Sequence, residues 1–178
     1  MKEVFKVIGN FEKTNQKFWN GFANHNHKAV IRDIMKVKKE EADYSGLINQ
    51  NSRYFLQIQN GCDHRCTFCI IPFGRGNAIS LPIGEISRRT EKILKMGFSE
   101  IVLTGVDLTS YGDDLPGKPK LGNILKRLFA LHPNLKRLRL SSIDPAEIDE
   151  DLFDLFSFEK RLMPHLHLSL QSGDNLIL

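Results

Sequence analysis

All three cysteines of the chain lie in one eight-residue stretch: Cys62, Cys66 and Cys69 belong to the motif CDHRCTFC. Three is an odd number for a disulfide framework and one short of most structural metal sites. Three thiolates from one loop can hold three corners of a cubane 4Fe–4S cluster and leave the fourth iron without a protein ligand. That iron can accept a substrate or cofactor atom, as the open position of a catalytic zinc does. The spacing therefore predicts an iron–sulfur site with one open corner, beside which Phe68 provides an aromatic cover.

The composition of the chain is that of an ordinary globular protein. Its 178 residues are 41% hydrophobic and 26% charged, which argues against disorder. The net charge of +4 is spread along the chain, so contact with a polyanion is permitted but not required. No apolar run approaches the ~20 residues that cross a bilayer, and the start MKEVFKV does not read as a signal peptide. We therefore expect a cytoplasmic protein with no membrane association and with reduced cysteines.

Two parts of the chain differ in character. Residues 1–50 are polar and rich in Asn and Lys, and we expect one short helix or strand there, followed by a linker. The mixed charges of KVKKEE indicate a solvated face, and His25 and His27 are expected to be exposed. Residues 51–178 alternate regularly between two patterns. We predict strands at 53–59, 100–105, 137–143 and 165–173, and helices at 82–97, 121–133 and 144–156.

The helix boundaries carry recognisable signals. Pro82 and Gly97 bracket the first helix, and Asp144 is predicted to cap the third, with Pro145 at its first position and Glu147 three residues after the cap. Repeated strand–helix units imply parallel strands joined by right-handed crossovers. The fold class is therefore α/β, either a barrel or a doubly wound sheet.

The faces of two predicted strands favour the barrel. Polar side chains alternate with leucines in both: Arg137, Arg139 and Ser141 in one, and His165, His167, Ser169 and Gln171 in the other. A strand between two helical layers would be apolar on both faces, whereas a ligand-holding barrel has a polar interior. An open sheet with one solvent-exposed face remains the alternative. In a barrel the active end is formed by the carboxyl ends of the strands, here residues 59–61, 104–105, 141–142 and 171–173.

The motif CDHRCTFC closely resembles the signature of radical S-adenosylmethionine enzymes. The longer text QNGCDHRCTFCIIPFGRG resembles the methylthiotransferase branch of that family, as do EIVLTGVDLTSYG, RLRLSSIDPAEI and HLHLSLQSGDN. LTGVDLTSYG is most similar to the branch members that modify threonylcarbamoyladenosine next to the anticodon of tRNA. The resemblance covers about residues 51–178. It implies a partial (β/α) barrel of the radical SAM type that stops after about the fourth strand, and VIGNFEK in residues 1–50 resembles the tail of the preceding domain.

The resemblance also implies a reaction. Cys62, Cys66 and Cys69 would ligate one 4Fe–4S cluster, whose open iron binds the amino and carboxylate groups of S-adenosylmethionine. An electron, from a donor such as flavodoxin or ferredoxin, cleaves the sulfonium, and the resulting deoxyadenosyl radical abstracts hydrogen from the substrate. The implied activity is methylthiolation of N6-threonylcarbamoyladenosine in tRNA. The cofactor-binding positions that the resemblance suggests are Phe68, Thr104, Gly105, Arg139, Ser141 and Gln171. The alternative is that the strand-end residues bind no cofactor and belong to an ordinary barrel interior, where Ser and Gln satisfy each other's hydrogen bonds.

The chain departs from the family pattern in two respects. The family has an N-terminal domain with three further cysteines, and this chain has no cysteine outside residues 62–69. It also stops just past the fourth predicted strand, before the last strands and the RNA-binding module of the family. We therefore expect the middle piece of a larger enzyme, inactive alone.

Two alternatives to this enzyme reading remain. The chain could be a zinc-binding nucleic-acid module with His64 or a distant histidine as fourth ligand, although His64 is awkwardly close to Cys62 and Cys66 for one tetrahedral site. It could also be a non-functional remnant of a split gene. Six basic residues could contribute to an RNA surface, but on amphipathic helices such charges usually face water: Arg88, Arg89, Lys92, Lys126, Arg127 and Lys136.

Overall fold

The computed structural model describes residues 3–24, 26–37 and 52–177, and its centre is a parallel sheet. The sheet consists of β3 (Arg53–Gln57), β6 (Glu100–Thr104) and β7 (Arg137–Leu140), in that spatial order. Just beyond β7, β8 (Ser142–Ile143) pairs in parallel with β9 (His167–Leu168). A barrel wall keeps the strands in chain order, whereas a doubly wound sheet reverses that order. The structure therefore agrees with the predicted partial barrel of about four strands.

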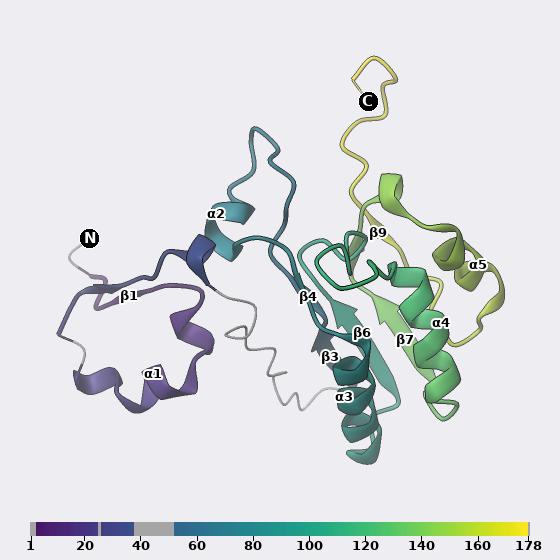
Figure 1. The fold of residues 1–178 in the computed structure, drawn as a ribbon, viewed down its shortest axis with the longest axis horizontal. Helices are drawn as coiled ribbons and strands as arrows, with labels where there is room; N and C mark the ends of the chain where they lie inside the picture. Colours follow the sequence, from purple (N-terminus) through teal and green to yellow (C-terminus); the bar gives the residue numbers. More distant parts are fainter. Residues whose placement is uncertain (1–2, 25, 38–51, 178) are drawn as a thin grey trace.

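Three helices lie along one side of this sheet (Figure 1). They are α3 (Ile83–Lys95), α4 (Leu121–Leu131) and α5 (Glu150–Phe158). Alternate strand side chains are buried in one hydrophobic cluster with the apolar stripes of the helices, including Leu56, Ile101, Leu138, Ile86, Ile93, Ile124, Leu125, Leu128 and Leu152. Pro82 precedes α3 and Gly97, with φ +90°, follows its end, as the boundary signals predicted. No helix within the described residues is both long and apolar enough to cross a membrane.

The opposite face of the sheet is polar at its amino end. Glu100 is buried there, and its carboxylate accepts hydrogen bonds from Arg137 at 3.1 Å and Arg139 at 3.0 Å, while Arg53 lies 4.0 Å away. Burial alone would raise the pKa of the Glu100 carboxyl, but the hydrogen bonds and charges of the three arginines outweigh it and hold this pKa below its ordinary value of 4.5. The predicted polar face of β7 is therefore real, and at this end it is filled by an ion-pair network.

Replacing Glu100 with glutamine should remove a pH-dependent part of the stability. A carboxyl whose pKa is lower in the folded state stabilises the fold above the unfolded pKa, and this contribution is lost as the pH falls through the folded pKa. We expect the free energy of unfolding of the Glu100→Gln variant to lie below that of the parent at pH 6 and to approach it below about pH 4. Urea unfolding at several pH values measures this difference. Glu3→Gln, at an exposed position, is the control, and a pH-independent gap between parent and Glu100→Gln would contradict the assignment.

The predicted helix at 144–156 begins later than expected. Asp144 caps only the 3₁₀ turn η5 (Pro145–Glu147), and Ile148 then takes an extended conformation with ψ 117°. Asp149 caps α5 by accepting from the Leu152 amide at 2.9 Å, and it also accepts from the Gly122 amide in α4 at 3.0 Å. The predicted N-cap at Asp144 was therefore wrong for this helix: α5 is capped by Asp149, whose side chain also contacts α4.

The last predicted strand is also shorter than expected. Of residues 165–173 only His167–Leu168 form a strand, and Gln171 lies beyond it with φ +62°. The alternating leucines Leu166, Leu168 and Leu170 are exposed rather than buried. A period-two pattern produces a buried face only where another layer covers it, and no helix of the described residues buries these leucines.

The N-terminal part has more regular structure than the predicted single short element. β1 (Val7–Ile8) pairs in parallel with β2 (Ala29–Val30), and between and after them lie η1 (Glu12–Thr14), α1 (Gln16–Asn20), η2 (Phe22–Asn24) and η3 (Ile34–Lys36). His27 is exposed, as predicted. His25, most of KVKKEE and the predicted linker up to residue 50 lie outside the described residues, so the boundary between 1–50 and 51–178 stays a prediction.

Candidate iron–sulfur and cofactor site

The cysteine loop starts where the first barrel strand ends. β4 (Gln59–Asn60) pairs in antiparallel fashion with β5 (Ile79–Ser80), and the loop and the short helix α2 (Ile71–Arg75) lie between them. Gly61 has φ +75°, and a Cβ there would lie 2.0 Å from the carbonyl oxygen of Asn77, so glycine is required just before Cys62. The Cys62 amide donates to the Gly76 carbonyl at 3.1 Å. The two ends of the cysteine loop, at residues 59–62 and 76–80, are therefore hydrogen-bonded to each other where the loop leaves the barrel and returns to it.

The three thiols are free and accessible. Cys62 and Cys69 are partly buried, Cys66 is exposed, and the Cys69 amide donates to the Cys66 carbonyl at 3.0 Å. Burial raises the pKa of the Cys62 thiol, and the charges of Asp107 and Cys69 act in the same direction, against a backbone hydrogen bond from the His64 amide. Soft thiol donors grouped on one exposed loop suit iron–sulfur ligation, so this donor set fits the cluster. Phe68 is 79% exposed beside them and leaves the cysteines open.

Gln59 holds the start of the loop to the end of β6, a role that the sequence analysis did not assign. The side chain is completely buried, and its Oε1 accepts from the amides of Val106 at 2.8 Å and Asp107 at 3.0 Å. Its Nε2 donates to the Gly61 carbonyl at 2.8 Å. A Cβ on Gly105 would lie 2.8 Å from the same Oε1, so a glycine suits this close approach. The sequence located both segments at strand ends but contained no signal for their contact.

Three of the predicted cofactor positions are at the carboxyl ends of adjacent strands. Thr104 ends β6, Gly105 follows it, and the Ser141 amide donates to the carbonyl of Leu103 at 3.1 Å. The Ser141 Oγ is buried without a hydrogen-bond partner among the described residues, and so is the Asn60 Oδ1 at the end of β4. Both atoms lie at the strand ends where the resemblance places a cofactor, and a cofactor or an ordered water would satisfy them.

The structure does not bring the other two strand positions to the same place. Arg139 Nε is bound to Glu100, at the amino end of β6. Gln171 is exposed and lies past the end of β9. Neither residue hydrogen-bonds Ser141, so the mutual satisfaction of Ser and Gln expected for an ordinary barrel interior is not found among the described residues. Their contacts with a cofactor stay predictions.

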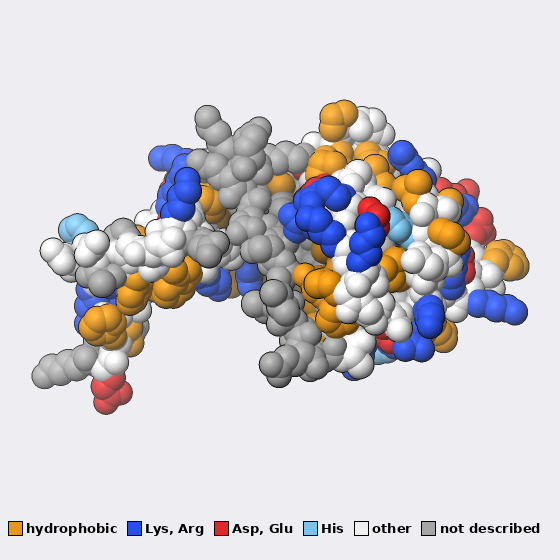
Figure 2. Space-filling view, turned by 90° about the horizontal axis from the view of Figure 1, so that it is seen from below, with side chains coloured by type: hydrophobic (Ala, Val, Ile, Leu, Met, Phe, Trp, Pro, Cys, Tyr) orange, Lys and Arg blue, Asp and Glu red, His pale blue; other side chains and the backbone are white. Residues whose placement is uncertain are grey.

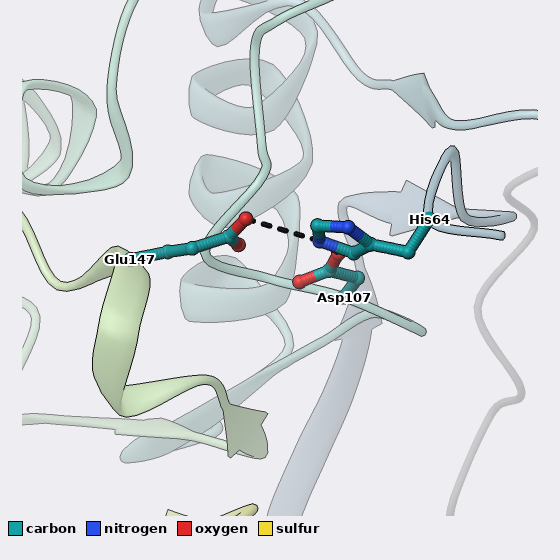
Figure 3. A group of neighbouring side chains, drawn as sticks. All are labelled: His64, Asp107 and Glu147. Carbon is teal, nitrogen blue, oxygen red and sulfur yellow. Dashed lines mark hydrogen bonds and ion pairs between the residues drawn. The ribbon is translucent and has the colours of Figure 1, made fainter. Parts of the chain in front are cut away.

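The His64 ring points toward two carboxylates (Figure 3). Its Nε2 lies 3.0 Å from Glu147 Oε1 and 3.3 Å from Asp107 Oδ2. In the described part of the chain, the group of three ligand atoms within 4.8 Å of one another is this one, and it contains no sulfur. The zinc alternative, with His64 as the fourth ligand beside the cysteines, gains no support from this geometry.

The six basic residues do not act as free charges throughout. Arg88 and Arg89 both bind Glu85, at 2.5 and 2.7 Å, and Lys126 binds Asp151 at 2.6 Å. The two arginines lower the pKa of the Glu85 carboxyl to about 2. In Figure 2, Lys and Arg side chains accordingly lie beside Asp and Glu on the core, with apolar side chains between them. Three of the six basic residues thus have a carboxylate partner, and two of these share Glu85, so part of the charge expected for an RNA surface is neutralised locally.

Residues 56–178 match the radical SAM superfamily. The chain belongs to this superfamily. Among solved structures it is similar to the radical S-adenosylmethionine methyltransferase TsrM from Kitasatospora setae, with tryptophan substrate and a SAM analogue bound, at a TM-score of 0.58 and 14% identity. That likeness covers 80% of this chain and 29% of TsrM, and it supports the fold.

Curated relatives share much more sequence with this radical SAM chain. The threonylcarbamoyladenosine tRNA methylthiotransferase MtaB of Rickettsia prowazekii is 49% identical over all 178 residues, and that of Aquifex aeolicus is 35% identical over 180. The tRNA-2-methylthio-N(6)-dimethylallyladenosine synthase of Rickettsia rickettsii is 35% identical over 156 residues. The chain spans 42% of the R. prowazekii protein, 43% of the A. aeolicus protein and 35% of the synthase.

Proposed function

We propose that this chain is the radical SAM core of an enzyme that methylthiolates N6-threonylcarbamoyladenosine in tRNA. The observation that carries the proposal is the 49% identity to MtaB of R. prowazekii, which extends over the whole chain. The dimethylallyladenosine synthase matches 86% of the chain at 35% identity, so the first substrate class is favoured. As a radical SAM enzyme it would work in the cytoplasm, with an external one-electron donor such as flavodoxin or ferredoxin.

The residues of the loop and strand ends have distinct roles in this proposal. Cys62, Cys66 and Cys69 hold the 4Fe–4S cluster, which when bound supplies the electron and the open iron for cleavage of S-adenosylmethionine. Phe68, which is 79% exposed and leaves the cysteines open in this structure, would cover that corner only once the cluster is bound. The backbone at Thr104 and Gly105 approaches the amino acid part of the cofactor, and the orphaned Ser141 Oγ offers it a hydrogen bond. Arg139 and Gln171 belong to this set only if the cofactor draws them toward the strand ends.

A chimaera tests the substrate directly. Residues 1–178 replace the matching segment of the R. prowazekii relative, and the product is expressed in a bacterium without its own threonylcarbamoyladenosine methylthiotransferase. We expect mass spectrometry of tRNA nucleosides to show the methylthiolated threonylcarbamoyladenosine, and we expect none with Cys66→Ala in the same chimaera. Methylthiolated dimethylallyladenosine in its place would refute the substrate assignment. A chimaera that binds iron and cleaves S-adenosylmethionine but modifies no tRNA would refute the proposed function.

A further inference from the structure

We propose that His64 is a positioning residue that bridges Asp107 and Glu147 and so fastens the cysteine loop to the barrel. The three side chains come from the carboxyl ends of successive strands. His64 lies in the loop after β4, Asp107 follows β6, and Glu147 lies in η5, after β8. One imidazole nitrogen thus contacts two strand ends 40 or more residues away, at 3.3 and 3.0 Å. The inference rests on the fold and this geometry and does not depend on the tRNA substrate.

Asp107 is better fixed than the histidine. Asp107 has a side chain only 10% exposed, its Oδ1 accepts from Thr109 Oγ1 at 3.2 Å, and its amide is held by Gln59. Thr109 Oγ1 in turn accepts from the Asp144 amide at 3.1 Å, which joins the exits of β6 and β8. The His64 side chain is 50% exposed. A half-exposed ring in a loop therefore meets, in Asp107, an acceptor that the barrel already holds.

Other hydrogen bonds of the loop close it on itself. Arg65 donates to the carbonyl of Cys62 at 2.9 Å and to Asn77 at 2.6 Å, and Asp63 accepts from the Ala78 amide at 3.0 Å. All these partners belong to the loop or its exit. Gln59 ties Gly61, just before the cysteines, to the end of β6. From residues 62–69 themselves, the links to the second and third strand ends in the described part of the chain run through His64 and through the Cys62 thiol, which lies 3.8 Å from Asp107 Oδ2. His64 therefore sets where the loop lies over the barrel mouth.

The bridge also suits a metal-loaded loop. Asp107 Oδ2 lies between the Cys62 Sγ, at 3.8 Å, and the His64 Nε2, at 3.3 Å. A carboxylate next to a metal-bound thiolate repels it unless a hydrogen-bond donor is present. The His64 Nε2, which is hydrogen-bonded to Glu147, lies close enough to Asp107 Oδ2 to weaken this repulsion from within the same loop. We therefore infer that His64 contributes to the retention of iron as well as to the position of the loop.

Hydrogen exchange and iron loss test the bridge on the full 178-residue chain. In the metal-free chain, His64→Ala should speed amide exchange in residues 62–69 about fivefold, the loss of roughly one hydrogen bond to a charged group that is partly solvent-exposed. After anaerobic reconstitution with iron and sulfide, iron transfer to a chelator should accelerate by a similar factor. His64→Gln keeps a donor at the Nε2 position and should restore most of both quantities. His27→Ala, at an exposed histidine of the N-terminal part, should change neither.

A double-mutant cycle separates a bridge from a general loss of structure. Because His64 makes both contacts and Glu147 only one of them, the exchange rate in His64→Ala/Glu147→Ala should match that of His64→Ala rather than the product of the two single effects. The urea midpoint should stay unchanged in all of them. Parent-like exchange in His64→Ala, or multiplicative effects in the double variant, would overturn the proposal even if the chain took up no iron. Equal losses in His64→Gln and His64→Ala would also overturn it.

Discussion

Replacing Cys66 with alanine is expected to abolish cluster assembly. The parent chain, reconstituted anaerobically, should hold about four irons and show the brown colour of a 4Fe–4S cluster. Cys66 is the most exposed of the three cysteines, and it lies between the other two in the loop. Its removal leaves two thiols for a cubane that needs at least three protein ligands here. Iron content, acid-labile sulfide and visible absorption measure the result, and we expect all three to fall close to zero.

The control for this experiment lies next to it in the chain. Thr67→Ala changes an exposed side chain of the same loop and adds or removes no thiol. It should retain parent-like iron content. A Cys66→Ala variant that still bound about four irons per chain would show that the cluster is not held by the three-cysteine loop. Zinc in the parent chain with no iron after anaerobic handling would instead revive the zinc alternative.

Replacing Gln59 with leucine is expected to cause the largest loss of stability at the site. Leucine fills a similar volume but leaves the amides of Val106 and Asp107 and the carbonyl of Gly61 without their partner. Each buried polar group without a partner costs about 1–3 kcal/mol, and partial access to water reduces this, so we expect a loss of about 2–4 kcal/mol. Urea unfolding measures it. Without the hydrogen bond from Gln59 to the Gly61 carbonyl, Cys62 is also held less firmly, and we expect the affinity of the chain for iron to fall.

Gln57 provides a matched control two residues earlier. Its Nε2 donates one hydrogen bond, at 3.2 Å, to the carbonyl of Gln59, and the residue is partly exposed. The Gln57→Leu variant removes the same kind of side-chain amide at the end of β3 and should cost less than about 1.5 kcal/mol. Equal losses in the two variants would mean that Gln59 does not have the special role assigned to it.

The local patterns of this sequence determined much of the fold. Helices 83–95 and 121–131, strands 53–57, 100–104 and 137–140, and the parallel sense of the sheet all follow from periodicity, boundary residues and the handedness of crossovers. The cysteine spacing and the surrounding motifs led to the radical SAM family, which the match over residues 56–178 shows. These features could be predicted because each depends on residues close together in the chain.

Other features depended on which distant residues meet. Gln59 contacts a loop 47 and 48 residues away, and His64 contacts Glu147, 83 residues away. Asp149, rather than Asp144, caps α5, and its carboxylate also accepts a hydrogen bond from the Gly122 amide of α4. No local pattern encodes such contacts, since a side chain that bridges two segments looks in sequence like any polar residue at a strand end.

The sequence by itself thus determined the ligand types and their spacing in the loop, and so predicted its chemistry, because these are properties of a short segment. Only the tertiary structure decided how that loop is held. It showed that Arg139 is engaged by Glu100, that Ser141 has a free Oγ at the strand ends, and that His64 faces carboxylates rather than sulfur. The physical reason is that hydrogen bonds and ion pairs across the barrel mouth form between whichever side chains the packed strands and helices bring within about 3 Å of each other.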